Sequence, residues 1–183
     1  MKRCTRNVYF FLQIADMPHR TLATETYYHI YNRGWNKQTL FYKYSDYEKF
    51  YANIDKYLEK YLNVKIFAYC FLPNHFHFLL GETKSPGSIE PGLSSELSKF
   101  VGQVQQAYAM YFNARYQQTA KEGRKAPVFE GRFKAKVINS DEYLSEVQTY
   151  IEHNAVKHEL VDRAEDWSWS SLRARALISP YFE

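Results

Sequence analysis

The stretch that decides the fold runs from residue 64 to residue 80 and reads VKIFAYCFLPNHFHFLL. Its first part, Val64 to Phe71, is almost wholly apolar and rich in β-branched and aromatic side chains, which is typical of a buried strand. The dipeptide Pro73-Asn74 is a turn signal. His75 to Leu80 reads as a second strand that stops at Gly81. The sequence therefore predicts a β-hairpin here.

The segments on either side of the hairpin show further strand and helix patterns. The predicted strands are residues 27–33 and 133–138, and the predicted helices are residues 45–62, 93–116 and 141–154, with turn-rich or polar residues at 81–92 and 117–127. The resulting order is β-α-β-β-α-β-α. This order predicts an α+β fold of the ferredoxin-like kind, an antiparallel sheet with helices packed on one face.

The composition is that of one folded domain with features that suit nucleic acids. The chain has 183 residues, and we divide it into an appendage at residues 1–20 and a domain at residues 21–183, with a tail from about residue 157. Aromatic residues reach 18% and the net charge is +4, a combination that suits phosphates and stackable bases. A protein with an aromatic core and a mildly basic surface, without any role in nucleic-acid binding, would have the same aromatic content and net charge.

Cysteine use and hydropathy exclude several classes of protein. Cys4 and Cys70 stand far apart and form no CxxC pattern, which excludes a disulfide-rich scaffold and a cysteine zinc site. No apolar run reaches the about 18 residues of a membrane helix. The apolar stretch at residues 8–12 is too short for a signal peptide. We therefore expect a cytoplasmic protein without a membrane segment.

Two histidines in the second strand of the hairpin form a candidate metal site. Side chains two positions apart on a strand point to the same face, so His75 and His77 share one face while Phe76 and Phe78 point into the core. The two imidazoles can then converge on one ion. His-x-His also occurs on solvated sheet faces, and the HxHxDH pattern of zinc hydrolases is absent. The motif alone leaves both interpretations open.

A tyrosine and an asparagine on the last predicted helix form a second candidate pair. Tyr150 and Asn154 are four residues apart and so share one face of that helix. Tyrosine can act as a covalent nucleophile beside a metal-polarised phosphorus, and an amide oxygen can complete a metal site. With 17 tyrosines in the chain, packing is the commoner role, and helical spacing does not distinguish Tyr150 from Tyr143.

A row of cations is a candidate DNA-binding surface. Arg132, Lys134 and Lys136 share one face of the strand at 133–138, which suits a phosphate backbone. Lysines also protect edge strands from aggregation, so both roles are open. Further basic or aromatic candidates are Arg124 and Lys125, just upstream, and His29, Tyr31 and Arg33, which alternate on the first strand.

Together these segments resemble the REP-associated tyrosine transposases and the related single-tyrosine insertion-sequence transposases of the HUH endonuclease superfamily. The most specific matches are PNHFH at residues 73–77 and YIEHN at residues 150–154. The family often has Asn-Pro where this chain has Asn154-Ala155, and proline would help to end the helix there. The other matching segments are YHIYNRG at 28–34, YFN at 111–113, FEGRFK at 129–134 and WSS at 169–171.

The resemblance implies a specific chemistry. His75 and His77 would hold a divalent metal, Mg²⁺ or Mn²⁺, with Asn154 as a third contact. Tyr150 would attack a phosphorus in single-stranded DNA beside a hairpin and form a 5′-phosphotyrosine link, which a 3′-hydroxyl can reverse. Glu152 and His153 flank this site and can assist. Members act as monomers or as homodimers, and both states are compatible with this chain.

Three other functions are compatible with the sequence. The first is a hairpin or single-stranded DNA binding protein that keeps the transposase fold without catalysis. The second is a metal-dependent phosphodiesterase that uses water as its nucleophile. The third is a structural protein with incidental histidines.

Overall fold

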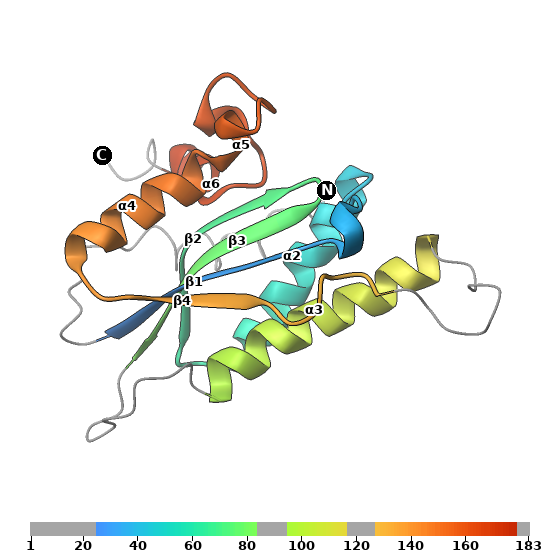
Figure 1. Ribbon diagram of the computed structural model, residues 1–183, viewed down its shortest axis with the longest axis horizontal. Helices are drawn as coiled ribbons and strands as arrows, with labels where there is room; N and C mark the ends of the chain where they lie inside the picture. The colour runs from blue at the N-terminus through green and yellow to red at the C-terminus, as the bar shows by residue number, and fades with distance from the viewer. Residues whose placement is uncertain (1–24, 84–94, 117–126, 179–183) are drawn as a thin grey trace.

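The computed structural model describes residues 25–83, 95–116 and 127–178 (Figure 1). The predicted appendage at residues 1–20 and the candidate cations Arg124 and Lys125 lie outside these residues. The strands are β1 Glu25–Arg33, β2 Val64–Leu72, β3 His75–Thr83 and β4 Lys134–Ile138. The helices are α2 Tyr44–Leu58, α3 Ser95–Tyr116, α4 Asp141–Glu152, α5 Asn154–Lys157 and α6 Ser171–Ile178, with 3-10 turns η1 Trp35–Lys37 and η2 Ala164–Asp166. None of the helices in the described ranges is long and apolar enough to cross a membrane.

The four strands form one antiparallel sheet in the order β2-β3-β1-β4. The predicted hairpin is confirmed, because Leu72 of β2 pairs with His75 of β3 across the turn. The α+β class with an antiparallel sheet is confirmed as well. In the register of β1, Tyr31 pairs with His77 on one side and with Lys134 on the other. Directly paired residues point to the same face, so these three side chains share one face of the sheet.

Helices cover both faces of the sheet. One face packs against α2 and α3 through a core that includes Ile30, Phe50, Phe76, Phe78 and Phe100. The other, which we call the α4 face, packs against α4 through Tyr27, Cys70, Leu79, Val147 and Ile151 (Figure 1). The sequence predicted helices on one face of the sheet, and α2 and α3 lie there. It did not predict that α4 covers the other face. The physical reason is the nearly unbroken apolar run of β2, which leaves no polar side for water.

The helix that carries Tyr150 is shorter than predicted. α4 ends at Glu152, His153 adopts φ −92° and ψ 7°, and α5 begins at Asn154. Tyr150 and Asn154 therefore belong to successive helices and not to one unbroken helix. The backbone still continues in helical fashion, since the N–H of His153 donates to the carbonyl of Thr149 at 3.0 Å.

The C-terminal tail is part of the fold, because residues 167–171 dock on the outer edge of β2. The N–H of Phe71 donates to the carbonyl of Trp169 at 2.9 Å, and Trp167 Nε1 donates to the carbonyl of Phe71 at 3.0 Å. The N–H of Tyr69 donates to Ser171 Oγ at 3.1 Å. The tail therefore covers one edge of the sheet, and β4 is the edge strand on the other side.

Candidate functional site

Aromatic rings from three elements meet on the α4 face. The ring centroids of His77 from β3 and His29 from β1 lie 5.1 Å apart. The ring of Tyr150 from α4 lies 5.7 Å from His77 and 5.9 Å from His29. His75 joins the group, 5.2 Å from His77. The structure thus brings together three side chains that the sequence singled out, the two β3 histidines and Tyr150.

Strand alternation and helix packing produce this cluster. His77 lies between Phe76 and Phe78, which are buried in the core on the opposite face. On α4, the fully buried side chain of Ile151 holds the helix against the sheet, and the neighbouring Tyr150 lies over the histidines. Tyr150 is 40% exposed, so a substrate can reach it. Its hydroxyl has no hydrogen-bond partner among the residues that the structure describes.

Both histidines of β3 use Nδ1 for a hydrogen bond, which leaves Nε2 for a second partner. His75 Nδ1 lies 2.6 Å from Asn74 Oδ1 and donates to it, because a carbonyl oxygen only accepts. His77 Nδ1 lies 2.9 Å from His29 Nε2. When His29 accepts in this pair, Nε2 of His77 carries a free electron pair, as Nε2 of His75 does. This is the form of imidazole that binds a metal ion.

Burial keeps these rings neutral. It is the main cause that lowers the pKa of His29 to about 4, the pKa of His75 to about 4 and the pKa of His77 to about 2. The positive charge of neighbouring groups acts in the same direction, whereas Asn154 beside His75 partly offsets the lowering of that pKa. Near neutral pH the uncharged, metal-binding form of each ring is therefore populated.

We expect acid to destabilise the protein through these histidines. An unfolded histidine has a pKa of about 6.5, and the folded rings titrate at about 4 or below. The unfolded state therefore binds more protons between these values, so stability is full above about pH 6.5 and falls as the pH drops toward 4. Urea unfolding across this range measures the slope. His77→Gln should show a shallower pH dependence than the wild type, and equal slopes would contradict this assignment.

Asn154 offers a third donor beside the histidines. Its side chain is fully buried beside His75, and among the described residues neither Oδ1 nor Nδ2 makes a hydrogen bond of good geometry. A buried amide without a partner costs about 1–3 kcal/mol, so a ligand that satisfies it is favoured. The described part of the chain holds no metal-binding group of three or more His, Cys, Asp or Glu side chains. The two imidazoles and the amide oxygen fit a divalent metal, and the nitrogen ligands favour Mn²⁺ over Mg²⁺.

Several residues of this region did not stand out in the sequence. His29 was one of several candidates on the first strand, and only the register places it against His77. Lys157 Nζ lies 4.9 Å from the ring centroid of Tyr150, and the ring of His158 lies 4.9 Å from that of His75. Their positions three and four residues after Asn154, one turn further along, are the signal that could have found them.

Glu152, which the sequence left as a possible assistant, points elsewhere. It is buried, accepts a hydrogen bond from Ser171 Oγ at 2.8 Å and forms an ion pair with Arg175. Both partners lie in α6. Glu152 therefore anchors α4, the helix that carries Tyr150, to the C-terminal tail. The flanking His153 is exposed, with Nδ1 3.0 Å from the carbonyl of Thr149.

Two of the predicted cations lie beside the rings. Lys134 and Lys136 pair with Tyr31 and His29 of β1, so all four side chains belong to the α4 face. Both lysines are exposed. They therefore line one side of the candidate site with positive charge. Because β4 is an edge strand, edge protection remains a second role for them.

Of the two candidate arginines, Arg33 forms an ion pair, whereas Arg132 is exposed and precedes β4. Arg33 forms a two-pronged ion pair with Glu130, in which Nη2 donates to Oε1 at 2.9 Å and Nε donates to Oε2. The charge of Arg33 is thus already matched, and this pair ties the end of β1 to the segment before β4.

Comparison with known proteins places the site within a family. A family model described as "Transposase IS200 like" matches residues 23–154, which include both β3 histidines, Tyr150 and Asn154. The chain belongs to the IS200-like transposases. The resemblance inferred from the sequence motifs is thereby confirmed.

Two proteins similar to this IS200-like transposase are REP-associated tyrosine transposases by name. A Haemophilus influenzae protein named as a REP-associated tyrosine transposase is 28% identical over 104 residues, which are 57% of this chain and 56% of that relative. The match thus spans just over half of the relative's length. A solved structure of a REP-associated tyrosine transposase bound to a REP hairpin has a TM-score of 0.61 at 17% identity, over 86% of this chain and 82% of the other. That likeness shows the shared fold.

Proposed function

We propose that this transposase cuts and rejoins single-stranded DNA beside a hairpin, through a 5′-phosphotyrosine link on Tyr150. The observation that carries the proposal is the contact of the accessible Tyr150 ring with the neutral rings of His77 and His29. The hairpin comes from the solved relative, which is bound to one. The partly matching Haemophilus influenzae relative supports the same class of activity.

In the proposed reaction, Tyr150 Oη attacks the phosphorus of a phosphodiester. A new bond forms between this oxygen and phosphorus, and the bond from phosphorus to the 3′ oxygen breaks. The phenolic proton is lost to solvent, and the leaving oxygen takes up a proton as a free 3′-hydroxyl. A divalent metal, when bound by His75, His77 and Asn154, would polarise the phosphate and offset its negative charge. Another 3′-hydroxyl can reverse the step, so rejoining needs no nucleotide energy.

The chain's own cations support this reaction at two points. Lys157 lies over the ring of Tyr150, where its charge favours the approach of a phosphate to the hydroxyl. Lys134 and Lys136 flank the rings on β4 and offer contacts to the DNA backbone. A phosphodiesterase that uses water, or a protein that only binds DNA, does not need a tyrosine in this position.

Mass spectrometry of the protein after incubation with Mn²⁺ and a hairpin oligonucleotide with a single-stranded flank tests the proposal. We expect a covalent adduct that maps to Tyr150. Cleaved DNA without any adduct would indicate a water-using phosphodiesterase. Tight binding across several hairpins with neither cleavage nor adduct would favour a protein that only binds DNA.

We expect His29 to tune metal binding through its hydrogen bond to His77. In His29→Ala, His77 Nδ1 loses its partner at 2.9 Å, and the affinity for Mn²⁺ should fall about 10- to 100-fold, as for other partners of metal ligands. His29→Gln offers an amide oxygen as acceptor and should restore most of the affinity. Calorimetric titration with Mn²⁺ measures both variants. Equal affinities in the wild type and His29→Ala would show that the hydrogen bond does not support a metal site.

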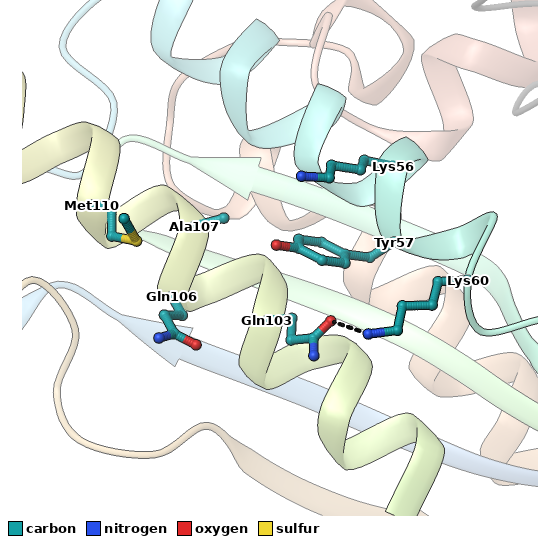
Figure 2. Close-up of a pocket in the computed structure, with 7 residues that line it drawn as sticks. All are labelled: Lys56, Tyr57, Lys60, Gln103, Gln106, Ala107 and Met110. Carbon is teal, nitrogen blue, oxygen red and sulfur yellow. Dashed lines mark hydrogen bonds between the residues drawn. The ribbon is translucent and has the colours of Figure 1, made fainter.

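We expect Lys134 and Lys136 to contribute to the salt dependence of DNA binding. Each cation that neutralises a phosphate of a single strand adds about 0.7 to the slope of log affinity against log salt, so Lys134→Gln/Lys136→Gln should make the slope shallower by about 1.4. The control is Lys56→Gln/Lys60→Gln, in a hollow between α2 and α3 away from the α4 face (Figure 2). It removes the same charge and should leave the slope nearly unchanged. Equal changes of slope in the two double variants would contradict the assignment of Lys134 and Lys136 to DNA backbone contacts.

A further inference from the structure

A second hollow of about 260 Å³ lies between α3 and residues 129–133, the segment that leads into β4. We call it the α3 groove. Because α3 packs on the face of the sheet opposite the α4 face, the groove is separate from the Tyr150 site. Its volume lies just below the about 300–1,000 Å³ of typical small-molecule sites, which suits one small group. Its lining includes Gly102, Gln105, Gln106, Phe129, Arg132 and Phe133.

Gly102 helps to keep the groove open. A Cβ atom at this position would meet no atom within 4 Å. In contrast, a Cβ at Gly34 would lie 2.1 Å from the carbonyl oxygen of Gln38, and one at Gly81 would lie 2.3 Å from the ring of Phe67. Glycine weakens the interior of a helix. Within the described residues, packing thus gives no reason for glycine at 102, whereas an open groove does.

The groove presents aromatic rings and fixed amides. Phe129 and Phe133 line it; Phe129 belongs to the buried core, and the partly buried Phe133 packs against that core. Gln105 is buried, and its Oε1 accepts a hydrogen bond from Asn32 Nδ2 at 2.7 Å. The same Nδ2 donates to the carbonyl of Gly131 at 3.1 Å, so the amides are held in place. Aromatic rings stack on nucleobases, and glutamine amides pair with base edges, adenine above all.

A row of cations joins the groove to the Tyr150 site. Arg132 borders the groove, is exposed and has no ion pair within the described ranges. Lys134 and Lys136 follow it along β4 on the α4 face. β4 is an edge strand, with no further strand of the described sheet beyond it. A DNA strand whose phosphates follow these cations therefore reaches the sheet edge at Arg132, next to the groove.

We propose that the α3 groove binds one unstacked nucleobase from the single-stranded part of the DNA. The base stacks on the exposed part of Phe133, and the exposed amide of Gln106 contacts its edge, while the buried Gln105, whose Nε2 donates to the carbonyl of Val101 at 3.5 Å, lines the groove. This inference rests on the proposed function, because it names a binding position for the same DNA strand. It adds a second DNA contact, on the face of the sheet opposite the Tyr150 site.

Gly102→Phe tests the proposal, because it fills the groove where the structure has space. The control is Leu62→Phe, which places the same ring at a position that is 81% exposed and lines neither hollow. The probes are a hairpin oligonucleotide with a single-stranded flank and a series in which each flank nucleotide in turn is abasic. We expect one abasic position to weaken wild-type binding about tenfold. Gly102→Phe should weaken the intact probe similarly, with no further loss at that position.

Two outcomes overturn the groove assignment. One is a DNA affinity of Gly102→Phe equal to that of Leu62→Phe. The other is a loss in Gly102→Phe that adds equally to every abasic position. Thermal melting checks the fold of each variant, and Gly102→Met, with its flexible side chain, replaces Gly102→Phe if the latter melts below the wild type. The Tyr150 adduct is scored separately in the wild-type protein. If the adduct forms but the effects of Gly102→Phe and of the abasic position simply add, only the groove assignment is overturned. If these two effects do not add but no adduct forms, only the proposed chemistry is overturned.

Discussion

Tyr150→Phe should bind the hairpin oligonucleotide nearly as well as the wild type and form no covalent adduct with it. The substitution removes only the hydroxyl, which has no hydrogen-bond partner in the described structure, and keeps the ring that packs on His77 and His29. Loss of the nucleophile removes the whole route, so cleavage should fall at least about a thousandfold. Mass spectrometry for the adduct and gel analysis of the DNA strands measure the two effects together.

Tyr143→Phe is the matched control for this experiment. Tyr143 lies on the same helix, α4, and packs against the core of the α4 face. It has no ring contact with the histidines that the structure describes, so adduct formation should persist. Full cleavage in Tyr150→Phe would exclude the tyrosine mechanism and leave hydrolysis by water as the better explanation.

His75→Ala and His77→Ala should each lower cleavage by at least about a hundredfold, because the metal supplies several kcal/mol of charge stabilisation in the transition state. DNA binding should change far less, since the exposed lysines of β4 remain. Each variant should also lose measurable affinity for Mn²⁺, which calorimetry detects without DNA. This second measurement distinguishes loss of metal binding from loss of DNA binding.

His153→Ala is the control for the histidine variants. His153 is exposed and its Nδ1 lies 3.0 Å from the backbone carbonyl of Thr149, so both cleavage and Mn²⁺ affinity should stay close to the wild type. Because His77 is buried, the melting temperature of His77→Ala must be compared with that of the wild type. Retained cleavage in both His75→Ala and His77→Ala would exclude the proposed metal site.

The sequence by itself determined the local elements and the residues that they display. The apolar run of β2, the Pro73-Asn74 turn and the alternation of His75 and His77 with phenylalanines define the hairpin and the face that its histidines occupy. These features depend on neighbours in the chain, whose periodicity shows directly in the sequence. Tyr150 is different, since only the match to the family distinguished it from the other tyrosines.

The tertiary structure decided which of these local elements meet. It placed α4 on the second face of the sheet, which brings Tyr150 to the histidines, and it placed residues 167–171 against β2. It also joined His29 to His77, although 48 residues separate them in the chain. Such contacts follow from strand register and from the need to cover both faces of an apolar strand. No local pattern encodes them, because the register is fixed only when distant segments pack together.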